Sequence, residues 1–464
     1  MRYENMCRRL DGILRPDDSF DIIKRPISIG GYRGVMYMID GFVKDEVMEK
    51  IMEFMMSAGK KDVDALPNAR SFADRFISYV ETDITGDTEK VVTAVLSGTL
   101  ALVLERYEQV FLIDVRTYPN RGVEEPDDDK VLRGAHDGFS ETMVVNTALI
   151  RRRIRDPRLR VKICSVGRES RTDIAVVYMN EKADVKVLKR VMTLLDGLNV
   201  DSLTMAQQSL SEAMNKKGWF NPFPKVRYTE RPDAAAASVL EGKIALIVDN
   251  SPSVMIVPSA IFDFVQDAND FYFPPMVGTY LRWVRMLMFF ATLFLTPVWF
   301  LLVKNPQLLT GWLEFLVIEE PARLPLVAQL LIFEFVMDGL KLASLNTPGS
   351  LSNSFSVVGA LILGEFAVSS GLFCPDVILY MAFVAIGNFT QPSFELGYAF
   401  KMVRILLIVL IALFNFWGLI AGVAVFILLI AFNRTFTCTS YLYPLIPFDG
   451  KALLSLFIRV KKNR

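Results

Sequence analysis

The feature that most constrains the fold is a long apolar block from Met286 to Phe432. It opens with an uncharged run, Met286–Val303, that lies between Arg285 and Lys304. At ~1.5 Å per helical residue, such a run is about long enough to cross a hydrocarbon core of ~30 Å. Further apolar runs follow at 324–340, 355–373, 376–389 and 405–432. Because these successive runs would leave a soluble fold without a polar face, the block predicts an all-α polytopic membrane domain of about five or six helices.

The residues before this block carry charges at the density of an ordinary soluble domain. The chain has 464 residues with a formal net charge of zero, so no global field favours nucleic acid or an acidic substrate. Residues 1–20 contain no apolar run of the kind that a cleaved signal peptide needs, so we expect the soluble part to stay on the cytoplasmic side. The expected domains are an N-terminal α/β segment at 1–90, a soluble α/β domain at 91–275 with a second lobe from about 183, the membrane domain at 276–434 and a cytoplasmic tail at 435–464.

Chemistry-bearing motifs are scarce in this sequence. The four cysteines lie far apart and form no CxxC pair, which favours isolated reduced thiols. His136 is the only histidine, and the sequence contains no Walker A loop and no GxGxxG after a strand. We therefore predict no catalytic residue, no cofactor, no metal site and no enzymatic activity.

Apolar runs separated by turn formers predict a mixed α/β fold for the soluble part. Strands are expected at 34–43, 99–105, 109–118, 171–180, 243–249 and 253–258, and helices at 44–58, 140–156, 185–198, 205–216 and 232–240. The two strands near residue 100 read as one hairpin, and those near residue 250 read as another with its turn at Asn250–Pro252.

Two charged stretches of the soluble part are candidates for interactions. The basic run Arg151–Arg155 could bind lipid headgroups or nucleic acid, but no aromatic residues interleave it. Ion pairs with the acidic loop at 124–129 are therefore the favoured use. The motif RYTERPD is too rich in charge for a core, so it is either a lobe or subunit junction or a solvated linker. Its charged residues are Arg227, Glu230, Arg231 and Asp233.

Carboxylates inside the apolar runs are unusual, because an ionised one at the bilayer centre costs ~2.5–3.5 kcal/mol on insertion scales. Glu334 and Asp338 share a helix face at i, i+4, and Lys341 follows one turn later. We expect Asp338 and Lys341 to form a structural ion pair. Glu334 and Glu365 are expected to attract cations or to join subunits.

A stripe of small and hydroxyl side chains follows from residue 352. Helical steps of three or four place Ser352, Ser356, Gly359 and Leu363 on one face. Such a stripe suits either close helix packing or a pore-lining helix with Leu363 or Ile362 as an apolar constriction. If it lines a pore, Glu365 lies near the mouth.

The basic residues beside the apolar runs predict the topology. Arg282 and Arg285 precede the first run, Lys401 and Arg404 precede the last, and four more basic residues lie at 459–464. All three groups lie on the cytoplasmic side only if the number of crossings is even. The last run should therefore turn back near Asn415–Gly418.

Five ordered blocks resemble the A subunit of spore germinant receptors, and most of all its stage V sporulation protein AF branch. They lie at 114–159, 222–258, 277–285, 345–352 and 386–405, and include the motifs VGTYLRWVR, LNTPGSLS and IGNFTQPSFELGYAFKMVRI. The resemblance runs from about Val110 to near the C-terminus, whereas residues 1–90 match only loosely.

This resemblance implies a protein of the inner membrane of bacterial endospores with its N-terminal domain facing the spore core. It also implies a pentameric ion channel that releases monovalent cations in germination. The implied partners are further copies of the chain, a transporter-like B subunit that senses nutrient and a C-subunit lipoprotein. A non-conducting scaffold and a secondary transporter remain as alternatives, although the sequence lacks the paired halves with broken helices that many transporters show.

Overall fold

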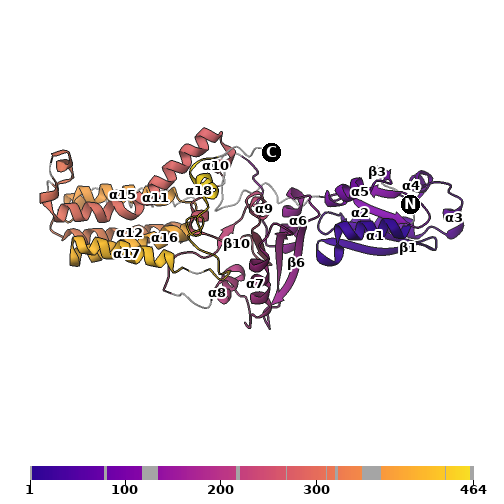
Figure 1. Cartoon of the computed structure of the whole chain (residues 1–464), viewed down its shortest axis with the longest axis horizontal. Helices are drawn as coiled ribbons and strands as arrows, with labels where there is room; N and C mark the ends of the chain where they lie inside the picture. Colours follow the sequence, from indigo (N-terminus) through magenta and orange to yellow (C-terminus); the bar gives the residue numbers. More distant parts are fainter. Residues whose placement is uncertain are drawn as a thin grey trace. The chain divides into compact units, whose positions relative to one another are not determined.

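The computed structural model describes residues 3–77, 81–117, 134–215, 220–267, 269–309, 311–318, 322–346, 367–433 and 435–459. The chain forms two compact units (Figure 1). The first, which we call the α/β unit, comprises Met1–Lys216, Val226–Ser259 and Thr435–Thr439. The second, the helical unit, comprises Lys217–Lys225, Ala260–Arg434 and Ser440–Arg464. The expected tail at 435–464 is thus shared between the two units.

The first lobe of the α/β unit is an antiparallel five-stranded sheet in the order β1-β2-β4-β5-β3. Its strands are β1 (Ile22–Ile29), β2 (Tyr32–Ile39), β3 (Thr82–Thr85), β4 (Leu100–Leu104) and β5 (Val110–Ile113). Its helices are α1 (Tyr3–Leu14), α2 (Asp45–Met56), α3 (Lys60–Asp64), α4 (Ala69–Phe76) and α5 (Thr88–Leu96). Alternate strand residues pack against α2 and α4 on one face and against α1 and α5 on the other. Because both faces are covered, the inner strands β4 and β5 are apolar throughout.

The second lobe is another antiparallel five-stranded sheet, in the order β6-β7-β9-β10-β8. Its strands are β6 (Leu159–Val166), β7 (Thr172–Met179), β8 (Arg227–Thr229), β9 (Ile244–Val248) and β10 (Val254–Val257). The helices α6 (Met143–Arg153) and α9 (Pro232–Leu240) cover one face, while α7 (Val185–Asp196) and α8 (Ala206–Met214) cover the other.

The structure confirms the mixed α/β fold and both hairpins, but it divides the soluble part differently from the expectation. The strands β4 and β5 pair with β2 and β3, so no boundary falls at residue 90. Pairing of β7 with β9 joins the stretches on either side of Ala183 in one sheet. The two lobes therefore separate between β5 and β6 rather than near 183.

A buried ion pair holds the two lobes together. Arg151 of α6 donates from Nε and Nη2 to the carboxylate of Asp21, just before β1, at 2.6 and 3.0 Å. Both side chains are at most 1% exposed. The backbone of Phe20 also donates to Val161 of β6 at 2.9 Å, so the chain before β1 pairs with the edge of the second sheet.

Two arginines of the basic run have partners other than the expected acidic loop. Arg151 pairs with Asp21, and Arg153 pairs with Asp137 at 2.6 Å. The loop at 124–129 lies outside the described residues. For Arg151, the sheet topology brings a carboxylate from far upstream to α6.

The described helices of the helical unit are α10 (Asn269–Tyr272), α11 (Pro275–Lys304), α12 (Leu326–Asn346), α14 (Ala367–Ser369), α15 (Pro375–Phe389), α16 (Phe394–Phe414), α17 (Phe416–Ala431) and α18 (Gly450–Phe457). Within the described residues, α11 and α16 are long and apolar enough to cross a membrane, and α15 and α17 are shorter apolar helices. Most of the expected span at 355–373 lies outside the described residues.

The expected turn near Asn415–Gly418 is confirmed. The helix α16 ends at Phe414, the φ of +54° at Asn415 breaks the helical path, and α17 returns alongside α16. A Cβ at Gly418 would lie 2.0 Å from the carbonyl oxygen of Leu410, so only glycine permits this approach. The Nζ of Lys304 donates to the carbonyls of Ile411 and Ala412 at 3.0 and 2.6 Å, which satisfies the end of α16.

Removing one member of the buried lobe pair should destabilise the α/β unit. Asp21→Ala leaves Arg151 buried without a carboxylate, so we expect the free energy of unfolding to fall by about 3–5 kcal/mol. Asp74→Ala removes an exposed partner of Arg70 and should change the free energy of unfolding by less than about 1 kcal/mol. Pulse proteolysis of the full chain in urea measures both values. Equally small losses for the two variants would show that the pair does not hold the lobes.

Candidate functional site

The charged residues of the helical unit come from two facing helices. Glu334 and Asp338 lie one turn apart on α12, as expected from their spacing. Lys401 and Arg404 lie at i, i+3 on α16, whose N-terminus is capped by the hydroxyl of Ser393. Arg404 is 1% exposed and Glu334 is 2% exposed, so these charges lie in the interior of the unit.

Arg404 ties three helices together. Its Nε and Nη2 donate to the two carboxylate oxygens of Glu334 on α12, the second at 2.9 Å. Its Nη1 donates to the backbone carbonyl of Thr292 on α11 at 2.6 Å. This fork geometry is specific to a guanidinium, which can engage a carboxylate with two parallel bonds and still reach a third acceptor.

Lys401 completes a network of balanced charge. Its Nζ donates to the backbone carbonyl of Glu334 at 2.6 Å, lies 3.6 Å from the Glu334 carboxylate and forms an ion pair with Asp338. Two carboxylates and two cations are therefore joined through direct contacts. Removing one member of such a buried set leaves an uncompensated charge.

The expected ion pair between Asp338 and Lys341 is replaced by another arrangement. Asp338 pairs with Lys401, and the ammonium of Lys341 lies over the rings of Phe389 and Tyr398, 5.5 and 5.3 Å from their centroids. A cation above an aromatic face is stabilised by the ring quadrupole. Lys341 thus reaches the aromatic rings of neighbouring helices instead of its own carboxylate.

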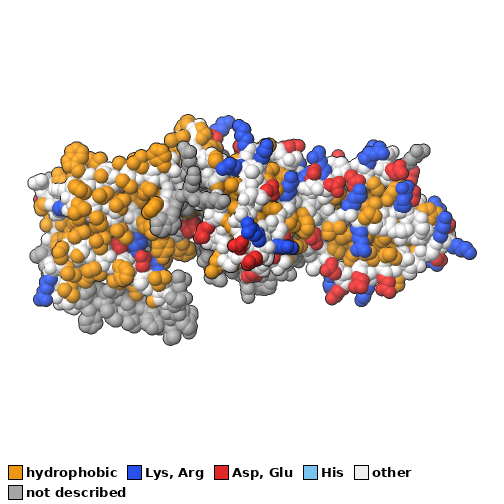
Figure 2. Space-filling view, turned by 90° about the horizontal axis from the view of Figure 1, so that it is seen from below, with side chains coloured by type: hydrophobic (Ala, Val, Ile, Leu, Met, Phe, Trp, Pro, Cys, Tyr) orange, Lys and Arg blue, Asp and Glu red, His pale blue; other side chains and the backbone are white. Residues whose placement is uncertain are grey.

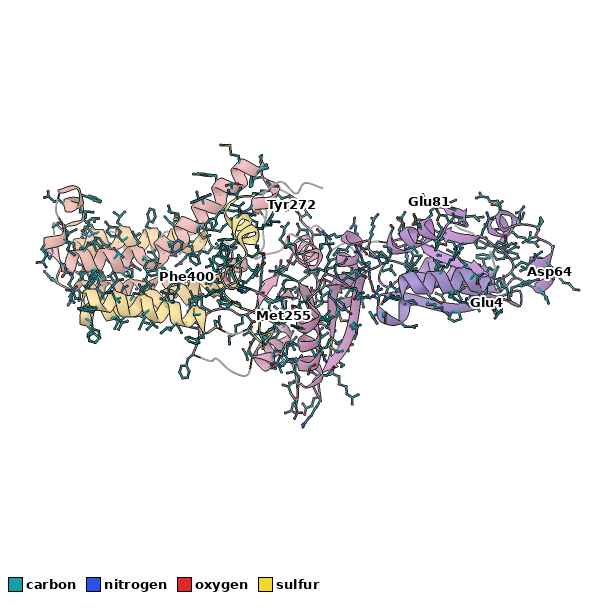
Figure 3. All side chains as sticks on the ribbon, in the orientation of Figure 1. Glu4, Asp64, Glu81, Met255, Tyr272 and Phe400 are labelled. Atoms are coloured by element: carbon teal, nitrogen blue, oxygen red, sulfur yellow. The ribbon has the colours of Figure 1, made fainter. Side chains whose placement is uncertain are left out.

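A polar layer extends from Arg404 across α11. The amide of Gln391 donates to the hydroxyl of Thr292 at 3.0 Å. The oxygens of the Gln391 and Asn388 amides and of the Thr296 hydroxyl are buried without a hydrogen-bond partner in the described structure. An aromatic core lies next to this layer around Phe400, which is labelled in Figure 3. Phe400 packs edge-on against Phe289 with their ring centroids 4.2 Å apart.

Sequence reasoning found half of the charge network. It singled out Glu334 and Asp338 but assigned Lys401 and Arg404 to the cytoplasmic side as topology markers. The structure buries both cations against α12. Lys401 and Arg404 lie one turn apart on one helix, as Glu334 and Asp338 do on another. These matched spacings of opposite charge are the signal from which the contact could have been predicted. The proposed pore residues Ser352, Ser356, Gly359, Ile362, Leu363 and Glu365 lie outside the described residues.

The motif RYTERPD lies inside the second lobe. It forms β8 and the start of α9, and the carbonyl of Glu230 accepts from the backbone of Phe139 at 2.8 Å. Arg231 is 1% exposed and donates to Asp233 at 2.7 Å. The motif is therefore part of the folded lobe rather than a solvated linker. A role for Arg227 and its neighbours between subunits remains a proposal.

The described residues contain no group of three or more histidine, cysteine, aspartate or glutamate side chains placed to hold a metal ion. In the charge network each carboxylate already has a cationic partner. The arrangement therefore suits joining helices in an apolar medium.

Comparisons with known proteins identify the family. The family model described as Bacillus/Clostridium GerA spore germination protein matches residues 10–464. The chain is 41% identical to stage V sporulation protein AF of Bacillus subtilis (strain 168), over 96% of this chain and 90% of that protein. It is 29% identical to spore germination protein KA of the same organism, over 80% of this chain and 68% of that protein.

Among solved structures, the chain is similar to the N-terminal domain of the A subunit of the Bacillus megaterium spore germinant receptor GerK3. That match has 21% identity and a TM-score of 0.42, and it covers 55% of this chain and 94% of the other. The family model spans nearly the whole sequence and a relative above 40% identity spans almost all of it. The chain therefore belongs to the GerA family of Bacillus and Clostridium spore germination proteins.

Proposed function

We propose that this chain is an integral protein of the spore inner membrane that acts in germination as a subunit of an ion-conducting oligomer. The oligomer, a pentamer in our proposal, releases monovalent cations. The names of its relatives, which include spore germination proteins, support a role in germination. The α/β unit faces the spore core, and a transporter-like B subunit and a lipoprotein C subunit, or equivalents, act with it.

The membrane assignment rests on the inverted polarity of the helical unit, in which charged side chains are buried and large apolar side chains are exposed. Many of its large apolar side chains point outward, with Phe335 80% exposed and Trp417 74% exposed, while Arg404 and Glu334 are almost fully buried. Figure 2 shows apolar side chains over much of the visible face of this unit. Water would penalise such a surface, whereas lipid matches it and requires ionised groups to be paired inside.

The charge network supports a role in positioning the conducting segment. It fixes α12 against α11 and α16, and α12 ends at Asn346, six residues before Ser352. In our proposal the stripe of Ser352, Ser356, Gly359 and Leu363 lines the path, with Leu363 or Ile362 as its narrow apolar ring. Glu365 raises the local cation concentration at the mouth.

Flux measurements with the full chain in proteoliposomes separate conduction from a scaffold role. A conducting oligomer dissipates a potassium gradient at a rate that rises with protein content, and its ring stoichiometry is visible in particle images. A chain that inserts and assembles but passes no ions would be a scaffold. Uptake that saturates with substrate and accumulates it against a gradient would indicate a transporter.

Substitutions at Leu363 should change conduction in opposite directions. Leu363→Ala widens the apolar ring and should leak cations, because water fills a wider neck readily, whereas Leu363→Trp should block the path. Potassium release from proteoliposomes or from spores measures both. Phe355→Leu and Val357→Ile lie off the stripe and serve as controls. If both Leu363 variants behave like the parent, this segment does not line the path.

Neutralising Glu365 should lower conductance without changing assembly. Glu365→Gln keeps the size of the side chain but removes the negative charge that concentrates cations at the mouth. Single-channel recording compares its unitary current with that of the parent at low ionic strength, where screening is weakest. An unchanged unitary current would remove Glu365 from the path.

Loss of charge balance at Glu334 should destabilise the helical unit. Glu334→Gln leaves Arg404 and Lys401 with one carboxylate between them, so we expect a loss of about 3–5 kcal/mol. Glu314→Gln makes the same chemical change at an exposed position of the same unit and should have little effect. Thermal unfolding of the full chain in detergent compares the two. Identical midpoints would show that the network does not hold the helices.

A further inference from the structure

One end of α11 extends beyond what a bilayer core can contain. The helix has 30 residues and is therefore ~45 Å long, whereas a hydrocarbon core of ~30 Å takes ~20 residues. Its uncharged part is Met286–Val303. If that part spans the core, the three turns from Pro275 to Arg285 lie at the level of the lipid headgroups or beyond.

The helix α18 is fixed to this end of α11. The Nη1 of Arg282 donates to the carbonyl of Ser455, and the backbone of Arg459 donates to the hydroxyl of Thr279 at 3.1 Å. The rings of Trp283 and Phe457 lie 5.8 Å apart. These contacts place the C-terminal segment beside the first turns of α11, so it is not a free tail.

Ion pairs also join the first turns of α11 to the residues just before that helix, and we call this region the corner. Arg285 donates from Nη1 to Asp270 at 2.7 Å and from Nη2 to Asp267 at 3.3 Å. Burial raises the pKa of the Asp270 carboxyl, although Arg285 opposes that rise. Gly278 allows the close approach, because a Cβ there would lie 2.3 Å from the carbonyl oxygen of Asp270.

The corner presents an exposed surface with apolar and basic parts, which we call the C-terminal face. Its apolar members are exposed large side chains: Ile446, Phe448, Leu454 and Ile458. Leu454 lies on α18, Ile458 directly follows the last residue of that helix, and the exposed Lys451 lies one turn before Leu454. Further basic residues, Lys461, Lys462 and Arg464, follow in the sequence. The neighbouring turns of α11 expose Tyr280 and Trp283.

We propose that the C-terminal face docks on the surface of a bilayer that contains anionic lipid and acts as an interfacial anchor. The inference rests on the proposed membrane insertion of the helical unit. Apolar side chains beside lysine are the composition of helices that lie in the headgroup region, and tryptophan and tyrosine concentrate at the same depth. The face also continues the outward apolar surface of α11, where Leu287 and Phe290 are exposed.

The positive charge of the C-terminal segment favours anionic lipid as the surface on which the C-terminal face docks. The C-terminal segment carries Lys451, Arg459 and three further basic residues at 461–464, while its one acid, Asp449, caps the N-terminus of α18. Each basic residue near an anionic surface strengthens docking about fivefold. Docking of this segment also restrains the first turns of α11 through Arg282 and Trp283.

Cysteine accessibility in nanodiscs tests the anchor. The full chain carries Leu454→Cys, Ile446→Cys, Leu287→Cys or Phe54→Cys, one at a time. Each is reconstituted at one copy per disc and, separately, at several copies per disc, in phosphatidylcholine alone or with phosphatidylglycerol. A water-soluble maleimide labels the cysteines, and mass spectrometry resolves each site from the native thiols. Phe54 of α2 is a matched control, because it and Leu454 are both 54% exposed.

In anionic discs, we expect the cysteine at 454 to be labelled at least about tenfold more slowly than the cysteine at 54. We expect the cysteine at 446 to be protected to the same degree. Adding Lys451→Glu should speed labelling at 454 more than about fivefold in anionic discs only. Protection at 454 should be weaker in discs of phosphatidylcholine alone.

Four results would overturn the inference in distinguishable ways. Fast labelling at 454 with protection at 287 refutes the anchor and leaves the membrane insertion standing. Fast labelling at 287 refutes the insertion itself. Equal protection at 454 in both kinds of disc refutes selection by anionic lipid. Protection that arises only in discs with several copies assigns the face to a second copy of the chain.

Discussion

The two-pronged contact between Arg404 and Glu334 is the interaction on which the helical unit depends. In an apolar medium a buried charge without a partner is costly, and here each charge has its partner while the third guanidinium bond reaches the backbone of α11. One side chain therefore fixes the positions of three helices. With these charges satisfied inside, much of the outer surface can be apolar, as lipid requires.

The α/β unit uses the same device for a different purpose. Arg151 engages Asp21 through a buried two-pronged contact that joins the lobes, and it also donates to the carbonyl of Leu159 at 3.2 Å. Lysine could not replace arginine at either position without losing this geometry. In each unit a buried arginine thus holds together elements that are far apart in the sequence.

Local patterns in the sequence predicted local structure well. The apolar block, the turn at Asn415 and one hairpin of each lobe, β4–β5 and β9–β10, follow from residue types that act within a few positions. Pairings between distant residues did not follow. Asp21 and Arg151 meet only because the chain before β1 reaches the edge of β6, and Lys401 reads equally well as a topology marker or as the partner of Asp338. The boundary near Ala183 failed because the pairing of β7 with β9 cannot be read from either strand alone.

Two native tryptophans test most directly whether lipid surrounds the helical unit. Trp417 is 74% exposed on α17, whereas Trp299 is 2% exposed inside α11. Bromine on the lipid chains quenches the fluorescence of tryptophans that it contacts. In proteoliposomes with brominated lipid, we therefore expect the quenched fraction of the emission to fall in Trp417→Phe and to rise slightly in Trp299→Phe. Unchanged quenching in Trp417→Phe would contradict a lipid-facing α17 and, with it, the inverted polarity on which the proposed function rests.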